Sequence, residues 1–288
     1  MDINFFYFLG LICSIKLLYQ SIRFVMPYLS RSAIKDYLQP DAYALVTGAT
    51  DGIGKAFALQ LAALGFNIII HGRDQARLEC TLEEIKTYNK NCTVICLPHD
   101  AGKKTPLNVE LIEGLNITVL INNVGMGPIF SLLDQSVGEI DKTITVNTIF
   151  PSQLTHLILK NMPKKALILN VSSYAGLLPP PYLAVYAGTK AYNNAFSNAL
   201  SREVDSDREI IALITGSVTT GSNKKPETFL RPSAEKYAKS VIKIIGCGRK
   251  TIVPYWPHAL QTWLISLLPE SVIDRTMKDT MQKELHNI

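Results

Sequence analysis

Tyr186 and Lys190 are the pair of side chains in this sequence best suited to acid–base chemistry. They lie in a predicted helix over Val185–Glu203, where residues four apart share one face. A nearby ammonium group favours the phenolate and lowers the pKa of a tyrosine from its usual value of about 10. Such a phenol can donate a proton to a carbonyl oxygen as hydride reaches the carbon, or accept it in reverse. The spacing alone is common, and two exposed side chains on a helix are its simplest explanation.

A glycine-rich turn follows the predicted strand Tyr43–Thr47. It reads Thr47-Gly48-Ala49-Thr50-Asp51-Gly52-Ile53-Gly54 and leads into a predicted helix over Gly54–Leu64. Its three glycines permit a tight turn, a close approach of the backbone to a pyrophosphate, and close packing of helix on strand. The positive end of the helix dipole then faces the phosphates. Strand, turn and helix in this order predict a dinucleotide site.

The end of the second predicted strand, Asn67–Ile70, bears on the choice between NAD and NADP. An acidic residue there binds the 2′-hydroxyl of NAD and repels the 2′-phosphate of NADP. The sequence reads His71-Gly72-Arg73, which has no acid and offers a guanidinium group suited to a phosphate. This favours NADP(H) over NAD. The alternative is that Arg73 is only a solvated cation at a helix start.

The elements that must position these residues follow from short apolar runs that alternate with helical patterns after residue 42. Strands are predicted at Tyr43–Thr47, Asn67–Ile70, Thr93–Leu97, Val119–Asn122, Ala166–Val171, Ile210–Thr215 and Thr251–Pro254. Helices are predicted at Gly54–Leu64, Ala76–Tyr88, Val137–Lys160, Val185–Glu203 and Ala234–Ile245. Continuous apolar runs are typical of strands covered on both faces. The alternation predicts an α/β fold with a single doubly wound parallel sheet of Rossmann type, which binds ligands at the carboxyl ends of its strands.

Four motifs in this order resemble the short-chain dehydrogenase/reductase family. They are TGxxxGxG at 47–54, Asn122-Asn123-Val124-Gly125, Ser173 thirteen residues before Tyr186, and the Tyr186–Lys190 pair. The resemblance covers residues 38–255 closely. It implies four catalytic residues, namely Asn147, Ser173, Tyr186 and Lys190, of which Asn147 matches the helix asparagine that supports a proton-relay water. It implies cofactor contacts from Gly48, Thr50, Asp51, Gly52, Ile53, Gly54, Arg73, Asp100, Asn123, Tyr186, Lys190, Val218 and Thr220. Thr215 stands where the family usually has proline.

Longer matches resemble the membrane-bound branch that contains 17β-hydroxysteroid dehydrogenases, very-long-chain 3-oxoacyl-CoA reductases and hydroxysteroid dehydrogenase-like proteins. They are TGATDGIGKAFA at 47–58, GLNITVLINNVGMG at 114–127 and LPPPYLAVYAGTKAY at 178–192. The resemblance implies NADP(H), a hydrophobic ketone or alcohol such as a 3-oxoacyl-CoA or steroid, and compatibility with a homodimer. It also implies a catalytic domain that faces the cytosol from the endoplasmic reticulum membrane.

The substrate loop is expected at Thr219–Pro232. Its cations Lys224, Lys225 and Arg231 would suit an acyl-CoA phosphate, although solvated loop charges are the simpler explanation. Two other functions stay open. A non-catalytic, cofactor-binding membrane adaptor would turn over no ketone, and an NAD-dependent alcohol dehydrogenase would bind NAD more tightly than NADP.

The first 35 residues are predicted to form a hydrophobic membrane-anchor segment. Residues 3–15 carry no charge, and the apolar character continues to Leu29 with interruptions at Lys16 and Arg23. A spanning helix needs about 20 mostly apolar residues. The segment therefore fits a signal-anchor helix, a helix lying in the membrane interface, or a helix docked on protein. Arg31 and Lys35 place the following domain on the cytoplasmic side.

The predicted dinucleotide-binding catalytic domain spans 36–254, and a C-terminal helical extension spans 255–288. The apolar stretch Tyr255–Leu268 is too short to cross a membrane and fits a core helix or a helix resting on a membrane. The formal charge of +5 includes no basic block, so no nucleic-acid partner is expected. Five cysteines without CxxC or His-rich spacing indicate no disulfide framework and no metal site.

Overall fold

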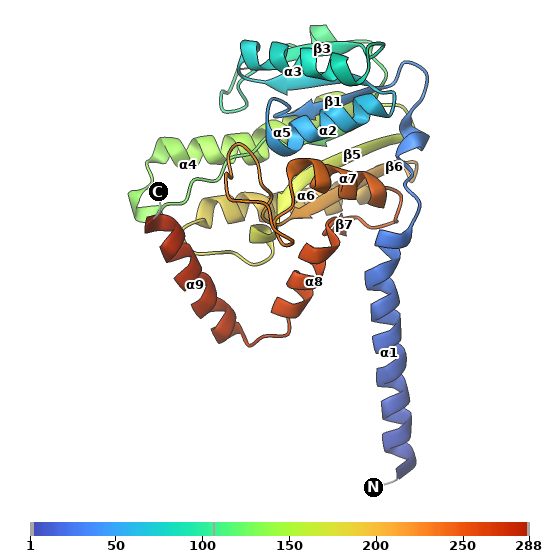
Figure 1. Cartoon of the computed structure of the whole chain (residues 1–288), viewed down its shortest axis with the longest axis vertical. Coiled ribbons are helices and arrows are strands. Elements are labelled where there is room, and N and C mark those ends of the chain that lie inside the picture. Colours follow the sequence, from blue (N-terminus) through green and yellow to red (C-terminus); the bar gives the residue numbers. More distant parts are fainter. Residues whose placement is uncertain (1–2, 106, 287–288) are drawn as a thin grey trace.

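The computed structural model describes residues 3–105 and 107–286, and a parallel sheet forms its centre (Figure 1). The strands are β1 Tyr43–Thr47, β2 Asn67–Gly72, β3 Val94–Pro98, β4 Ile117–Asn122, β5 Ala166–Ser173, β6 Arg208–Thr215 and β7 Thr251–Ile252. Their order is β3-β2-β1-β4-β5-β6-β7, with every neighbouring pair parallel. The order reverses between β1 and β4, which confirms the doubly wound sheet and places the ligand crevice beside these strands.

Helices cover both faces of the sheet (Figure 1). One face carries α2 Gly52–Ala63, α3 Gln75–Tyr88 and α7 Ala234–Ile244, and the other carries α4 Val137–Ile144, α5 Phe150–Leu159 and α6 Ala184–Glu203. Short 3₁₀ turns lie at Ile34–Tyr37, Glu110–Ile112, Leu132–Asp134 and Tyr174–Gly176. Buried parallel strands of this kind need apolar side chains in both directions, as the sequence indicated.

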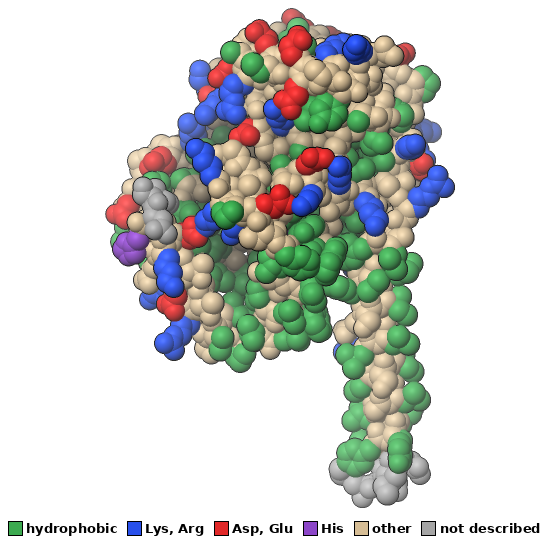
Figure 2. Space-filling model, in the orientation of Figure 1, with side chains coloured by type: hydrophobic (Ala, Val, Ile, Leu, Met, Phe, Trp, Pro, Cys, Tyr) green, Lys and Arg blue, Asp and Glu red, His purple; other side chains and the backbone are tan. Residues whose placement is uncertain are grey.

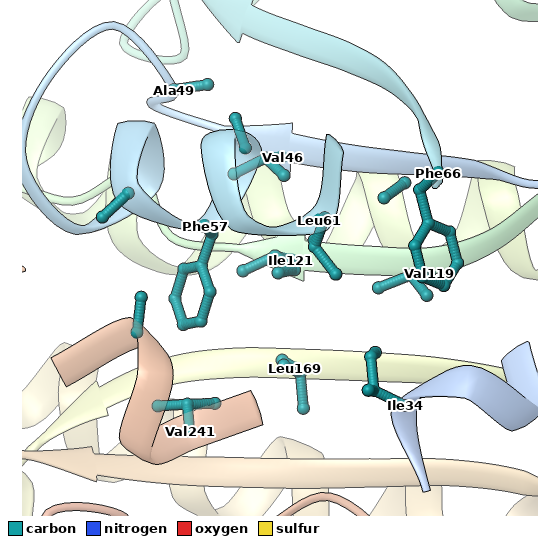
Figure 3. Close-up of a cluster of buried hydrophobic side chains, with 14 of the residues drawn as sticks. Ile34, Val46, Ala49, Phe57, Leu61, Phe66, Val119, Ile121, Leu169 and Val241 are labelled. Atoms are coloured by element: carbon teal, nitrogen blue, oxygen red, sulfur yellow. The ribbon is translucent and has the colours of Figure 1, made fainter. Parts of the chain in front are cut away.

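The core is divided by the sheet into two layers, because successive side chains of a strand point to opposite faces. In β1, Val46 belongs to the cluster under α2 and α7, whereas Leu45 belongs to the cluster under α5. Figure 3 shows the first cluster, where Phe57 and Leu61 of α2 and Val241 of α7 gather over the sheet. Each of these five side chains is at most 1% exposed, so the carboxyl ends of the strands rest on a rigid support.

A buried polar network crosses the second layer and joins β4, β5, α5 and α6. The Asn122 amide donates to Thr155 Oγ1 at 2.9 Å and to Asn170 Oδ1 at 2.8 Å. The Asn170 amide donates in turn to Ser197 Oγ at 2.8 Å. Buried hydrogen bonds of this kind fix the relative positions of the elements they connect. Among the described residues, the Asn122 amide oxygen has no partner of its own.

One long helix was expected over Val137–Lys160, and the structure shows an interruption within it. A π turn, Thr145–Ile149, separates α4 from α5. Pro151 has no N–H, so the carbonyl of Asn147 loses the donor that a regular α-helix would supply four residues later. Single π turns of this kind occur mainly at functional sites. Smaller differences are that β2 continues to Gly72, β5 continues to Ser173 and β7 ends at Ile252.

Helix α1, Ile3–Leu29, projects away from the domain at the N-terminal end (Figure 1). Within its stretch Phe5–Leu29, an 18-residue window has a mean hydropathy of 1.5 and none of that window is buried in the fold. Contact is confined to the last turns, where Tyr28 Oη donates to the Val253 carbonyl at 2.7 Å and Arg249 donates to the Arg23 carbonyl. The structure therefore does not support a helix docked on protein. The C-terminal extension consists of α8 Trp256–Ile265 and α9 Glu270–His286.

Candidate active site

A cleft of about 750 Å³ opens at the carboxyl ends of β1, β4, β5 and β6. Its lining includes ten of the residues predicted from the sequence, namely Gly48, Asp51, Gly52, Ile53, Asn123, Ser173, Tyr186, Lys190, Val218 and Thr220. The glycine turn and the Tyr186–Lys190 pair thus border one space, although at least 132 residues separate them in the sequence (54 to 186). The expected juxtaposition of turn and acid–base pair is present.

The glycines of the turn are required by its geometry. Gly48 and Gly52 have φ values of +63° and +54°, in the left-handed region that favours glycine. A Cβ on Gly54 would lie 2.3 Å from the Gly48 carbonyl oxygen, so helix α2 packs on the turn only without a side chain there. Asp51 caps α2 and accepts from the Gly52 N–H at 2.7 Å. The open turn at a helix N-terminus fits a dinucleotide pyrophosphate.

Thr47 and Asn123 connect the two strands on either side of the crevice. Thr47 Oγ1 accepts from the Asn123 N–H at 2.9 Å and the Val124 N–H at 3.0 Å. The Asn123 amide donates back to the Thr47 carbonyl at 2.9 Å. Because these bonds run between β1 and the segment after β4, they hold the crevice open at fixed width. Sequence reasoning gave Thr47 no role, although it stands at the start of the glycine motif.

Three candidate catalytic side chains meet in the cleft. Ser173 ends β5, and Tyr186 and Lys190 lie in the first two turns of α6. The preceding Ser172 has a separate structural role, because its hydroxyl donates to the Lys190 carbonyl at 2.9 Å and ties α6 to β5. Gly127 lies so close to the tyrosine ring that a Cβ there would be 2.4 Å from Tyr186 Cδ2. The ring is therefore confined between α6 and the segment after β4.

Burial sets the protonation states of the pair. It raises the pKa of the Tyr186 phenol, and the adjacent Ser173 hydroxyl opposes this with a smaller lowering. Burial also lowers the pKa of Lys190 to about 8. The lysine ammonium donates to the Val171 carbonyl at 2.8 Å and lies 5.6 Å from the centre of the tyrosine ring. The expected acidification of Tyr186 by Lys190 is absent from this structure, and the phenol is protonated at neutral pH.

Asn147 lies in the π turn behind the pair and is 1% exposed. Its amide donates to the Met126 carbonyl at 2.7 Å and to Thr189 Oγ1 at 2.9 Å, and its oxygen accepts from the Met126 N–H at 2.9 Å. Thr189 Oγ1 donates to the Tyr186 carbonyl at 2.7 Å. The side chain thus joins the segment after β4 to α6. It belongs to the wall of the site and does not line the cleft itself.

Four more predicted cofactor residues lie beside the lining of the cleft. Gly54 packs under the glycine turn, and the Thr50 methyl group would lie 2.9 Å from a Cβ on Gly72 at the end of β2. Arg73 is exposed directly after that strand. Asp100 follows β3, where its carboxylate accepts from the Gly102 N–H at 3.0 Å. These positions border the β2 and β3 side of the glycine turn.

His71 packs against the glycine turn from the interior of the domain. It is 1% exposed, and its Nδ1 accepts from the Gly48 N–H at 3.4 Å. Its ring stacks on Phe150 with centroids 4.9 Å apart, and His99 stacks on the same phenylalanine at 5.6 Å. Burial lowers the pKa of His71 to about 4, so it is neutral at physiological pH.

The segment after β6 closes one side of the cleft. Thr215, where the family usually has proline, is held by a 2.6 Å hydrogen bond with the Tyr237 hydroxyl. Arg231 Nε donates to Ser217 Oγ at 3.0 Å, and Lys225 pairs with Glu284 of α9. Two of the three loop cations therefore have partners in the fold.

The sequence of this domain matches a family of known proteins. Residues 42–229 match the family model for short chain dehydrogenase, which covers more than half of the chain and includes both the glycine turn and the tyrosine–lysine pair. The chain belongs to the short-chain dehydrogenase family. It is therefore an oxidoreductase built to use a nicotinamide cofactor, and the open glycine turn at the N-terminus of α2 fits that group.

Curated relatives of this short-chain dehydrogenase align with more of the chain than residues 42–229. A protein of Coprinopsis cinerea named very-long-chain 3-oxoacyl-CoA reductase is 35% identical over 282 residues, covering 90% of this chain and 83% of its own length. A protein of the same name from Kluyveromyces lactis is 37% identical, covering 78% of this chain and 70% of its own. These alignments support a ketone/alcohol reductase.

Solved structures share the fold of this short-chain dehydrogenase. A 7β-hydroxysteroid dehydrogenase superposes with a TM-score of 0.72 at 19% identity, covering 82% of this chain and 96% of its own. A Sphingobium yanoikuyae enzyme in complex with NADPH gives 0.65 at 21%, covering 80% and 97%. A Burkholderia phymatum enzyme in complex with NAD gives 0.67 at 22%, covering 77% and 91%. Both cofactors occur among these neighbours, so the fold alone does not select between them.

Proposed function

We propose that this enzyme is an NADPH-dependent reductase that converts the ketone of a 3-oxoacyl-CoA, or of a related hydrophobic lipid such as a steroid, to a secondary alcohol. The proposal rests on the meeting of Ser173, Tyr186 and Lys190 in the same cleft as the glycine turn. The names of the relatives, which align over most of their length, favour the acyl-CoA substrate.

Each side chain of the site has one role in the proposed reduction. When bound, the nicotinamide supplies hydride to the carbonyl carbon. Tyr186, protonated because burial raises its pKa, donates its proton to the carbonyl oxygen, and the Ser173 hydroxyl orients that oxygen. The resulting phenolate is stabilised by the ammonium of Lys190 and regains its proton from solvent. Asn147 acts as a positioning residue, because its bonds hold α6 against the segment after β4.

Arg73 supports NADPH over NADH. It is an exposed cation directly after β2, where the 2′-phosphate would lie. The neighbouring Arg77 already faces a carboxylate, Asp51, at 3.7 Å. Within residues 3–105 and 107–286, Arg73 forms no ion pair and is therefore available for a phosphate. Arg73→Ala should raise the KM for NADPH at least tenfold and leave that for NADH nearly unchanged. Tighter binding of NAD than of NADP in the wild type, with no loss in Arg73→Ala, would favour the NAD-dependent alternative.

We infer the cellular location of the enzyme from helix α1. The helix is long and apolar enough to cross a bilayer, and the domain covers only its last turns. We therefore place the enzyme at the endoplasmic reticulum membrane, with α1 as anchor and the catalytic domain in the cytosol, in keeping with the cations that follow the helix.

The decisive test is Tyr186→Phe, assayed by NADPH oxidation with a panel of 3-oxoacyl-CoA esters and ketosteroids. Turnover should fall by a factor of at least 100, in line with loss of a positioned proton donor, while NADPH affinity is retained. Tyr192→Phe is the matched control, because this exposed tyrosine lies on the same helix and bonds Ser152. Retained turnover in Tyr186→Phe refutes the proton donor. A wild-type protein that binds NADPH and reduces none of the ketones is the membrane adaptor.

A further inference from the structure

The outer side of α8 is a large exposed apolar surface. We call it the α8 surface, and it is continued by the neighbouring loop and by the turn into α9. Its members are each 43–63% exposed: Phe229, Leu230, Trp256, Trp263, Leu264, Leu267, Leu268 and Val272. Trp256 and Trp263 are seven residues apart and so share one face of the helix. A contiguous apolar patch of this kind marks a docking surface for a protein or a membrane.

The segment that forms this surface has two features that favour burial in lipid. Residues 255–269 contain no lysine, arginine, aspartate or glutamate. The turn after α8 bonds internally: the N–H groups of Ser266, Leu267 and Leu268 donate to carbonyls of α8 at 3.0–3.2 Å. The next residue, Pro269, has no N–H, and Ser266 Oγ donates to the Trp263 carbonyl at 2.7 Å. Polar groups satisfied in this way can leave water, which an irregular turn normally cannot.

The position of the α8 surface identifies its partner. The turn between α8 and α9 points to the same side of the domain as the free end of α1 (Figure 1). Figure 2 shows hydrophobic side chains gathered over α8 and along α1, with most charged side chains higher on the domain and a further group along α9. A bilayer entered by α1 would therefore meet α8 as well. Tryptophan is enriched where apolar protein surface meets the lipid headgroups, which fits both residues of this helix.

The inner side of α8 borders the candidate active site. His258 Nε2 lies 3.0 Å from the Leu230 carbonyl oxygen, and a Cβ on Gly216 would lie 2.7 Å from His258 Nδ1. Gly216 lines the cleft. Tyr174, one residue after Ser173, has its hydroxyl beside Thr262 of α8. One helix therefore faces the site with one side and carries the exposed apolar surface on the other.

We propose that α8 and its turn into α9 insert into the bilayer leaflet that adjoins the domain, as a second membrane contact besides α1. The cleft then opens at the membrane surface, where a substrate dissolved in lipid reaches it without crossing water. This rests on the proposed membrane location but is independent of the substrate and of the cofactor assigned above.

The chain carries its own probe for this contact, because its two tryptophans, Trp256 and Trp263, are both on α8. The experiment uses the full chain reconstituted into dioleoylphosphatidylcholine vesicles, with and without bromine on the acyl chains. Bromine quenches only tryptophans within the bilayer. We expect strong quenching in brominated vesicles, a blue-shifted emission, and protection from aqueous acrylamide. The single-tryptophan variants Trp256→Phe and Trp263→Phe then report each position separately.

Other occupants of the α8 surface give different results. A chain that floats with the vesicles and shows water-like emission without bromine quenching overturns the α8 contact and leaves α1 as anchor. Blue-shifted emission without bromine quenching indicates a second copy of the chain and also overturns it. Leu267→Gln should reduce quenching, whereas Leu111→Gln, at a leucine of 49% exposure on another element, should not. None of these fluorescence measurements requires turnover. A negative result would therefore overturn the α8 contact without affecting the reductase proposal.

Discussion

Replacement of Lys190 by methionine should stabilise the fold while abolishing turnover. The lysine is 4% exposed, and burial lowers its pKa from 10.5 to about 8. Since one pKa unit corresponds to about 1.4 kcal/mol, the charged ammonium costs the folded state about 3 kcal/mol at pH 7. Methionine keeps the unbranched chain without the charge, but leaves the Val171 carbonyl without its donor at a cost of about 1 kcal/mol. The net gain is about 2 kcal/mol, which raises Tm by about 4–8 °C.

The gain should depend on pH in a defined direction. Because the folded pKa lies below the unfolded one, the unfolded chain binds more protons between about pH 8 and 10.5, and wild-type stability rises over this interval. The advantage of Lys190→Met is therefore complete below about pH 8 and is lost as pH approaches 10.5. Circular dichroism melts of both proteins in one detergent, at pH 7 and pH 10, measure the difference.

Lys243→Met is the matched control, because this lysine is exposed on α7 and its replacement should change stability by less than about 0.5 kcal/mol. A Lys190→Met variant that melts below the wild type at pH 7 would refute the reasoning. So would a difference in Tm that is the same at both pH values, since it could not come from the buried charge.

Two glycine substitutions test the geometry of the cleft. Gly54→Ala places a Cβ 2.3 Å from the Gly48 carbonyl oxygen, so α2 must move away from the turn. NADPH affinity measured by calorimetry should therefore fall at least tenfold. An unchanged affinity would contradict the close packing of α2 on the turn. Gly127→Ala places a Cβ 2.4 Å from Tyr186 Cδ2 and displaces the phenol. The kcat should fall severalfold while NADPH affinity is retained. An unaltered kcat would show that the Tyr186 ring is not confined by Gly127.

The sheet was predictable because each strand is a continuous apolar run between turn residues. Residues such as Leu45 and Val46 serve opposite layers of the core, so a strand covered on both faces has a pattern that is hard to mistake. The interruption of the helix over 137–160 was not predicted. Its signal was Pro151, which removes a helical donor, but a proline one turn after a polar residue does not by itself distinguish a π turn from a kink or a helix end.

At the site, the sequence predicted which residues gather but not their electrostatics. Ser173, Tyr186 and Lys190 line one cleft as their motif positions indicated. Spacing on a helix says nothing about burial, however, and it is burial that raises the pKa of Tyr186 and directs the ammonium of Lys190 to the Val171 carbonyl. The partners of Asn147, Met126 and Thr189, come from distant segments and could be assigned only from the structure.

The buried amide network between β4 and β5 has a consequence for biogenesis. Asn170-Val171-Ser172 has the form of an N-linked glycosylation acceptor, and the nitrogen that would carry the sugar is the one that donates to Ser197 inside the core. Oligosaccharyltransferase acts on unfolded chain as it enters the lumen of the endoplasmic reticulum. A glycan on this nitrogen would break its hydrogen bond to Ser197 and could not fit between the strands. The buried sequon therefore agrees with the cytosolic placement of the catalytic domain proposed above.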